Sequence, residues 1–304
     1  MANKIYKLSF LTPVRFGLLR NTASLCTIHA DTLFSAVFIA LMETGKESAF
    51  LDAVREGRLS FSDGMPFKGE DYYLPRPVGV YPKSVEVETD PGTRKLMKKI
   101  QWVPLTHFEA WLAGKVRPEE LIVHFGHTME RTRVNRRDEI PVPYQVEGFR
   151  FDSDCGLYFV VQAASDAELS LMDEGMKLLM AAGIGGLKSS GWGKFNLSEA
   201  KVPDAMQKAL DDETNECQML LNVAWPAQAE GEETVANGNY VLVQRGGYAA
   251  ASGEPITLRQ TVWFFAPGST FKKRFSGDIL DISTTAPHPV WRCAKAMMMG
   301  VKSE

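Results

Sequence analysis

The amino-acid sequence predicts a two-domain protein of the α+β class. The main observation is the order of hydrophobic patterns in residues 1–205, where short apolar or alternating runs enclose two amphipathic helical segments. The order is strand, helix, strand, insertion, strand, helix, strand, which is the split βαβ arrangement of a ferredoxin-like domain. A chain of 304 residues is also long enough for a second domain, and its pattern changes after an acidic stretch that begins at residue 211.

The first strand and the first helix are expected before Gly45. Residues 5–11 alternate polar and apolar side chains, as a strand with one buried face does. Asp31 stands where its carboxylate can cap the first turn of a helix, and Gly45 lies just past the expected end. The apolar residues at helical spacing between them are Leu33, Phe34, Val37, Phe38 and Leu41. A short strand is expected at 59–63.

Residues 64–153 form the expected insertion. They contain nine prolines, which is too many for a regular core element. We therefore expect a loop-rich insertion with projecting loops or hairpins. One short helix is expected inside it, because Thr106 and Glu109 have the spacing of a capping box.

The last helix and strand of the first domain are expected from residue 157 onward. The apolar run 157–162 suits a buried strand, and helical periodicity follows over 166–182, with Gly183 as the stop. Residues 183–195 then form a glycine-rich loop that leads into another strand.

The second, smaller domain is expected over residues 206–304. The acidic stretch 211–216 is typical of a linker, and strand-like runs follow at 218–225, 239–245 and 260–265. No helix is indicated here, so this part is expected to be α+β or mostly β.

Composition narrows the class of protein. A formal charge of −3 argues against a protein that coats nucleic acid over its whole surface, but leaves room for a local basic track. The four cysteines, at 26, 155, 217 and 293, form no C-x-x-C pair, which suits free thiols in a reducing cytoplasm. We expect no signal peptide and no membrane contact, because the N-terminus lacks an apolar core and no run has the length of a membrane span.

The glycine-rich loop is the most informative local feature. Its thirteen residues hold five glycines, two lysines, two serines and a tryptophan. Free N–H groups, hydroxyls and ammonium groups together suit phosphate, and Trp192 offers a surface on which a base can stack. The spacing matches neither a nucleoside-triphosphate loop nor a dinucleotide fingerprint. A glycine-rich hairpin turn with a packed tryptophan is the alternative.

Three basic clusters can line such a site. Arg131 to Arg137 holds four arginines in seven residues, and arginine presents a planar fork to phosphate. A solvated strand with ion pairs to Asp138 and Glu139 is the alternative. The runs 94–99 and 272–274 are weaker candidates, and the first of them is typical of an exposed flexible loop.

Catalytic and metal-binding motifs are weak. His29 and Asp31 could act as a general base and its orienter, although helix capping also explains Asp31. His124 and His127 have a spacing possible for a metal pair, but no carboxylate or thiol cluster stands near them in the sequence. We find no Ser-His-Asp pattern and no paired acidic site, so we expect no enzyme activity, no metal and no cofactor.

Several motifs together resemble a known family, the RAMP proteins of type III CRISPR effectors. They are Thr12 to Gly17, Ile28 to Ala36, Thr132 to Arg137 before Gly156 to Tyr158, Gly185 to Phe195, Pro267 to Phe271, and Pro289 to Arg292. The sequence is most similar to the Csm-complex subunit that caps the 5′ end of the guide RNA in the type III-A system. The resemblance covers nearly the whole chain.

The resemblance implies a scaffold with two ferredoxin-like domains. Such a subunit grips the repeat-derived 5′ tag of the CRISPR RNA (crRNA), docks the large polymerase-like subunit and meets the first backbone subunit. A projecting thumb reaches over the RNA, and residues 64–153 are the natural place for it.

Combining the residues with the resemblance, we expect a set of RNA contacts from the loop, the arginine cluster and the start of the first helix. The set is Arg15, His29, Arg131, Arg133, Asn135, Arg136, Arg137, Gly185, Gly186, Lys188, Ser189, Ser190, Gly191, Trp192 and Lys194. The alternatives are a metal-independent endoribonuclease that matures CRISPR transcripts and an assembly module that binds only proteins.

Overall fold

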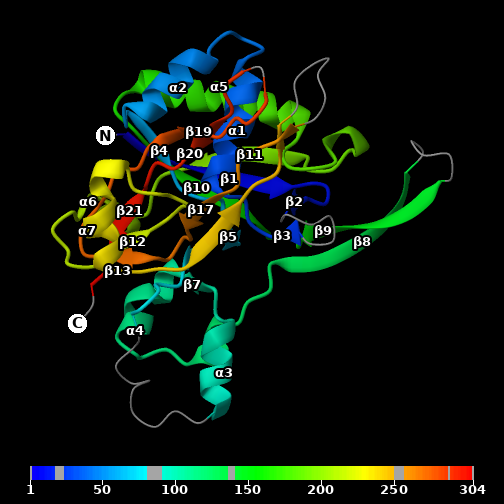
Figure 1. Ribbon diagram of the computed structural model, residues 1–304. Coiled ribbons are helices and arrows are strands. Elements are labelled where there is room, and N and C mark those ends of the chain that lie inside the picture. Colours follow the sequence, from blue (N-terminus) through cyan, green and yellow to red (C-terminus); the bar gives the residue numbers. More distant parts are fainter. Residues whose placement is uncertain are drawn as a thin grey trace.

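The structure, a computed structural model, describes residues 2–17, 24–80, 91–135, 141–249, 257–286 and 288–302. It mixes helices and strands, as expected for the α+β class (Figure 1). Its largest sheet has the order β11-β1-β10-β5-β6-β7, and β4 also pairs with β10. The strands are β1 (Ala2–Phe10), β4 (Leu59–Phe61), β5 (Met65–Lys68), β6 (Asp71–Pro75), β7 (Trp102–Pro104), β10 (Cys155–Ala163) and β11 (Phe195–Ala200). All of these pairs are antiparallel.

Three helices cover one face of this sheet (Figure 1). They are α1 (Ala30–Leu41), α2 (Glu47–Arg55) and α5 (Asp166–Ala182). Residues at odd positions of β10, such as Phe159 and Val161, pack with Met176 of α5 in one core cluster. α1 and α5 approach closely at Gly175, where a Cβ would lie 2.7 Å from Cγ1 of Val37. The predicted helix over 166–182 is confirmed, and Gly183 follows it with φ 81°.

The opposite face of the sheet packs on C-terminal elements. Tyr158 and Val160 of β10 share a second core cluster with Met206 of α6 (Asp204–Asp211) and Met219 of β12 (Gln218–Leu220). β12 belongs to a four-stranded sheet of order β13-β18-β12-β21. Its other strands are β13 (Gly238–Asn239), β18 (Thr270–Phe271) and β21 (Met298–Gly300). Because side chains alternate across a strand, β10 contributes to two cores at once.

The segment 64–153 is more regular than the loop-rich insertion that we expected, although the expected projecting hairpin is present. This segment supplies β5, β6 and β7 to the large sheet, then a helical unit and a long hairpin (Figure 1). The helical unit contains α3 (Pro91–Lys99), η2 (Leu105–His107), α4 (Phe108–Leu112) and η3 (Pro118–Leu121). The prolines led to a wrong prediction of loops because several of them stand at the ends of helices or strands, where a missing N–H costs little stability. They are Pro75, Pro91, Pro104 and Pro118. The short helix is present, but no side chain caps α4, so the predicted capping box does not form.

The hairpin consists of β8 (Gly126–Asn135) and β9 (Val142–Phe151) and projects away from the sheets (Figure 1). The two strands pair in continuous register from Gly126↔Phe151 to Asn135↔Val142. At its base, Val14 and Phe149 form an isolated bridge that attaches β9 to the segment after β1. The hairpin is therefore fixed at its root and extends beyond the core.

The C-terminal region contains helices that the sequence patterns did not indicate, α6 and α7 (Gly231–Ala236). No residue of α7 is buried, so it carries no apolar stripe from which it could be predicted. The remaining short elements are η5 (Gln228–Glu230), β14 (Leu242–Arg245), β15 (Tyr248–Ala249), β16 (Thr257–Leu258), β17 (Val262–Phe265), β19 (Ile279–Asp281) and β20 (Trp291–Cys293). No helix in the described ranges is long and apolar enough to cross a membrane.

Candidate RNA interface

Backbone hydrogen bonds hold both ends of the glycine-rich loop against the segment that follows β1. The N–H of Gly193 donates to the carbonyl oxygen of Pro13, and the N–H of Gly186 donates to that of Arg15, both at 2.8 Å. Gly193 has φ 75°, and a Cβ there would collide with the carbonyl oxygen of Ile184. Only glycine combines this backbone conformation with so close an approach.

The tip of the loop is a short 3-10 turn, η4 (Lys188–Ser190), whose three residues are exposed. The N–H groups of Ser190 and Gly191 close the turn by donating to Leu187 and Lys188. The N–H groups of Leu187, Lys188 and Ser189 donate to no acceptor within the described ranges. The tip therefore offers successive backbone donors, two hydroxyls and one ammonium group to an anion.

Fewer N–H groups of the loop are available to phosphate than the sequence suggested. Gly185, Gly186, Gly191 and Lys194 all lie in the loop, but the N–H groups of Gly186, Gly191 and Lys194 already bind protein oxygens. Lys194 is exposed directly before β11, so its ammonium group remains accessible. The guanidinium of Arg15 lies beside Gly186, where a Cβ would be 3.4 Å from one of its terminal nitrogens.

Trp192 does not provide the expected stacking surface. Its side chain is only 4% exposed. The indole packs against the backbone of β9 at Gly148, where a Cβ would collide with the ring. Trp192 instead fastens the loop to the root of the hairpin, which confirms the alternative of a packed tryptophan.

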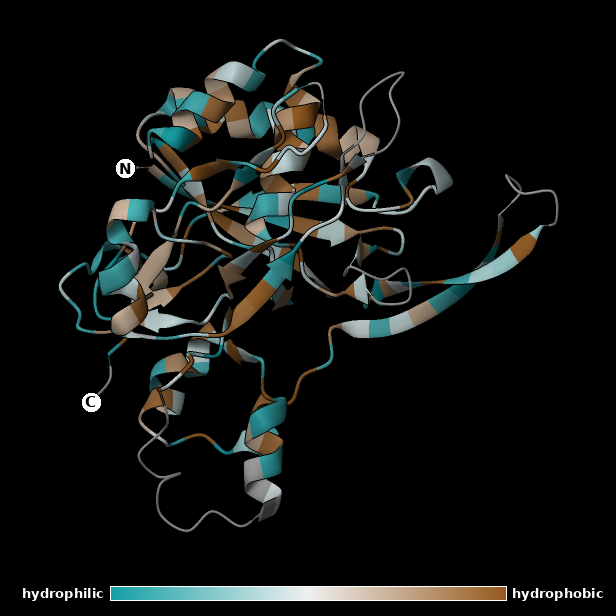
Figure 2. Cartoon of the chain, in the orientation of Figure 1, coloured by the Kyte–Doolittle hydropathy of each residue, from teal (hydrophilic) through white to brown (hydrophobic). Residues whose placement is uncertain are grey.

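The hairpin carries the first part of the arginine cluster. Arg131 and Arg133 lie two residues apart on β8, so they share one face, and neither forms an ion pair with another described residue. Asn135 ends the strand, whereas Arg136, Arg137 and the proposed ion-pair partners Asp138 and Glu139 lie outside the described residues. Figure 2 shows this arm as largely hydrophilic or pale.

His29 and Asp31 have partners that the sequence did not reveal. His29 Nδ1 lies 2.6 Å from Oδ2 of Asp63, and Oδ1 of Asp63 accepts from the N–H groups of Ala30 (2.7 Å) and Val223 (3.0 Å). Asp63, which follows β4, therefore caps α1, and the predicted capping by Asp31 is wrong. The His29 side chain is 11% exposed, so its ring mainly contacts protein.

Asp31 instead anchors a buried arginine cluster. It accepts two hydrogen bonds of 2.9 Å from Arg245 of β14 and one from Arg292 of β20. Burial by itself raises the pKa of Asp31, but the two guanidinium groups outweigh it and hold that pKa well below its ordinary value. Arg259 lies near the same cluster, where burial and the charge of Arg292 lower its pKa to about 10. The cluster ties α1 to the C-terminal strands.

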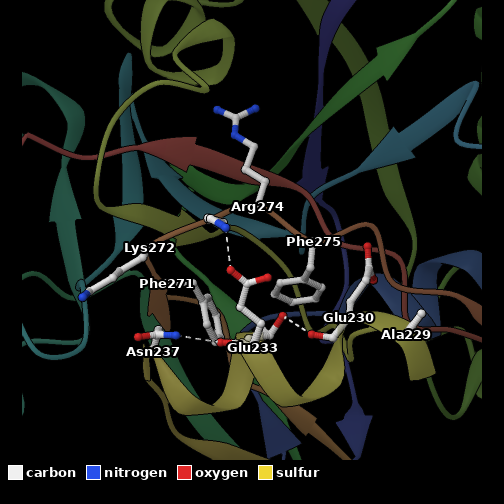
Figure 3. Close-up of a pocket in the computed structure, with 10 residues that line it drawn as sticks. Ala229, Glu230, Glu233, Asn237, Phe271, Lys272, Arg274 and Phe275 are labelled. Atoms are coloured by element: carbon white, nitrogen blue, oxygen red, sulfur yellow. Dashed lines mark hydrogen bonds and ion pairs between the residues drawn. The ribbon is translucent and has the colours of Figure 1, made fainter.

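The two weaker basic runs, 94–99 and 272–274, are less available to RNA than the hairpin arginines. Residues 94–99 lie within α3 rather than in a flexible loop. Lys272, Lys273 and Arg274 line a cavity of about 400 Å³ beside α7, together with Glu230 and Glu233 (Figure 3). Lys273 pairs with Glu233, and Arg274 donates to Gln218 at 2.7 Å. Two of the three cations in this run are therefore already engaged with protein groups, whereas Lys272 is exposed.

No group of three or more potential ligands for a metal ion occurs within the described ranges. His124 and His127 both lie near the start of β8, and His127 pairs with Arg150 across the hairpin.

The strongest candidate site is therefore the loop tip with Arg15, Lys194 and the adjoining hairpin.

Comparison with known proteins gives consistent relatives. A family model described as the CRISPR Csm4 C-terminal domain matches residues 213–301. The CRISPR system Cms protein Csm4 of Streptococcus thermophilus is 31% identical over 98% of this chain and 98% of its own length. The protein of the same name from Mycobacterium tuberculosis H37Rv is 29% identical over 99% of this chain and 98% of its own length.

Solved structures show the same fold. A chain in the crystal structure of a Csm3-Csm4 subcomplex of the type III-A CRISPR-Cas interference complex superposes with a TM-score of 0.69. It is 16% identical, and the match covers 98% of this chain and 99% of that one. A chain of a Csm1-Csm4 cassette in complex with AMPPNP has a TM-score of 0.64 and 21% identity, over 99% of this chain and 98% of that one.

Proposed function

Because this chain belongs to the Csm4 family of RAMP subunits in type III-A CRISPR complexes, we propose that it is a non-catalytic scaffold that binds the 5′ tag of crRNA. In this role it joins the large polymerase-like subunit to the backbone subunits. The similar solved structures support both partners, since they pair Csm4 with Csm1 and with Csm3.

One observation carries the RNA-binding part of the proposal. The loop tip, the segment 11–15 and the root of the hairpin form one continuous surface, held by the bonds from Gly186 to Arg15 and from Gly193 to Pro13. The Val14–Phe149 bridge and the packing of Trp192 on Gly148 complete the connection. An RNA strand that crosses this surface meets backbone donors at the tip and exposed cations on either side.

The chemistry of this surface suits an RNA backbone. Free N–H groups at 187–189, the hydroxyls of Ser189 and Ser190 and the ammonium of Lys188 can each bind a phosphate oxygen. Arg131 and Arg133 add planar donors on the hairpin, which we infer to be the thumb. The bases stay free to be splayed and recognised on their edges, as single-stranded RNA recognition requires.

The fold supports two ferredoxin-like domains, with a boundary near residue 205. The path β11-β1-β10-β4 has the antiparallel 4-1-3-2 strand order of that fold, and α1 and α5 lie on one face. We infer that the sheet β13-β18-β12-β21 forms the smaller second domain.

The test is the salt dependence of tag RNA binding in Lys188→Ala. The affinity should fall, and the slope of log K against log salt should flatten by about 0.7 for the lost phosphate contact. Lys201→Ala is the matched control, because Lys201 is 88% exposed and follows the far end of β11. Equal affinities and slopes for the two variants would remove the loop from the function.

A metal-independent endoribonuclease is the second candidate, because His29 and Asp63 pair as a base and its orienter do. Incubation with repeat RNA in EDTA tests it: cyclic-phosphate products that disappear in His29→Ala would support cleavage. We expect no product, because the His29 side chain is only 11% exposed and its ring mainly contacts protein.

A further inference from the structure

A second cavity, of about 230 Å³, lies at the root of the hairpin. Four aromatic side chains from different elements line it: Tyr73 of β6, Trp102 of β7, Phe125 just before β8 and Phe149 of β9. Tyr73 and Phe125 are buried and meet edge to face, with ring centroids 4.9 Å apart. Trp102 and Phe149 are half-buried and therefore present part of their surface to the cavity.

Polar groups lie among the lining residues as well. Gln101 and His124 are both exposed, and the side chain of neither forms a hydrogen bond to another described residue. A ligand that fits must therefore be flat and apolar on its faces and must carry hydrogen-bonding groups on its edge. A nucleobase has this character, and aromatic side chains are the usual stacking surfaces for unpaired bases.

The cavity adjoins the proposed phosphate-binding surface. Val14 and Phe149 exchange backbone hydrogen bonds of 2.8 and 2.9 Å, and the carbonyl oxygen of Arg15 holds Gly186 of the loop. Neighbouring paired strands lie about 5 Å apart, so a single strand pair separates the loop from the cavity. Lys99 at the cavity and Arg150 on β9 are exposed, and they supply positive charge close by for the flanking phosphates.

We propose that this cavity receives one splayed-out base of the single-stranded RNA that the glycine-rich loop holds. The inference rests on the proposed function, since it needs RNA on the adjoining surface. Trp102 and Phe149 stack on the base, and Gln101 and His124 read its edge.

The test uses the full chain and a set of tag RNAs in which each base in turn is removed to leave an abasic sugar. With the unaltered protein, one position should weaken binding by about 5- to 100-fold, because stacking contributes strongly at a single base. No change to the protein is involved in this arm, so misfolding cannot produce the result.

Trp102→Leu should then abolish the difference between intact RNA and the sensitive abasic RNA. Trp263→Leu, at a tryptophan of β17 that is 51% exposed, should leave the difference unchanged. Gln101→Ala with His124→Ala should reduce discrimination among the four bases at that position only.

The outcomes separate the two proposals. If intact RNA binds and depends on Lys188 but no abasic position matters, the cavity holds no base and the inference fails alone. It also fails alone if Trp102→Leu weakens all RNAs equally, or if the cavity instead receives a side chain of a partner protein. If intact RNA does not bind, both proposals fail.

Discussion

Replacing Asp31 by Asn tests whether the buried arginine cluster stabilises the protein. Asp31 is fully buried and accepts hydrogen bonds from Arg245 and Arg292, whose side chains are 11% and 2% exposed. Removing one partner of a buried ion pair costs about 3–5 kcal/mol, because the remaining charges stay desolvated without compensation. Asn keeps one carbonyl oxygen and hence one acceptor, so we expect a loss of about 3 kcal/mol in the free energy of unfolding. That is a large share of the roughly 5–15 kcal/mol that folded proteins possess.

The assay is urea unfolding followed by tryptophan fluorescence and by far-ultraviolet circular dichroism. With a slope of about 3 kcal/mol/M, the midpoint should fall by about 1 M. Asp204→Asn is the matched control, since the Lys201–Asp204 pair has side chains that are 88% and 86% exposed and should contribute almost nothing. Equal midpoints for the two variants would refute the reasoning.

The loss of stability in Asp31→Asn should also depend on pH. The pKa of Asp31 is lower in the folded protein than its ordinary value of 3.8, so its contribution is fully present above that value. The contribution is lost as the pH falls toward the lowered pKa. The difference in stability between wild type and Asp31→Asn should therefore stay constant from pH 7 to about pH 5 and shrink below about pH 4. A difference that grows on acidification would contradict the ion pair.

Three further predictions concern the loop, the hairpin and the thiols. Gly193→Ala should lower the melting temperature and weaken RNA binding, because the added Cβ collides with the carbonyl oxygen of Ile184. Gly191→Ala, with φ 81° but open space around it, should cost only about 1 kcal/mol of stability. Similar melting temperatures for the two variants would disprove the close contact at Gly193. Arg131→Glu with Arg133→Glu should reduce RNA binding while circular dichroism stays unchanged. Charge reversal at Arg117, which is exposed before η3 in the helical unit, should leave RNA binding unchanged; equal binding by the two variants would make the hairpin arginines solvated surface. Burial raises the pKa of Cys155 and of Cys293 to about 12, so mass spectrometry should find neither alkylated at pH 8 until the protein is unfolded.

Elements governed by local periodicity could be predicted from the sequence. The helix over 166–182 and its end at Gly183 follow from apolar residues at helical spacing and a terminal glycine. The exposed loop tip with Lys188 was also predictable, since glycines, serines and lysine seldom enter a core. The prolines of 64–153 were misleading, because proline marks the ends of elements as readily as it marks loops.

Burial and pairing across the chain could not be predicted in this way. Trp192 lies between two glycines, which suggested exposure, yet Gly148 provides the space in which the indole packs. The amino-acid sequence by itself determined the strands β1, β4 and β10, the long helix α5 and the composition of the loop, because each depends on residues only a few positions apart. The tertiary structure alone decided that Asp63 caps α1 and that Asp31 binds Arg292, a residue 261 positions away. Such pairs depend on which backbone segments pack together, and the physical reason is that burial of a charge is tolerated only where the fold delivers its partner.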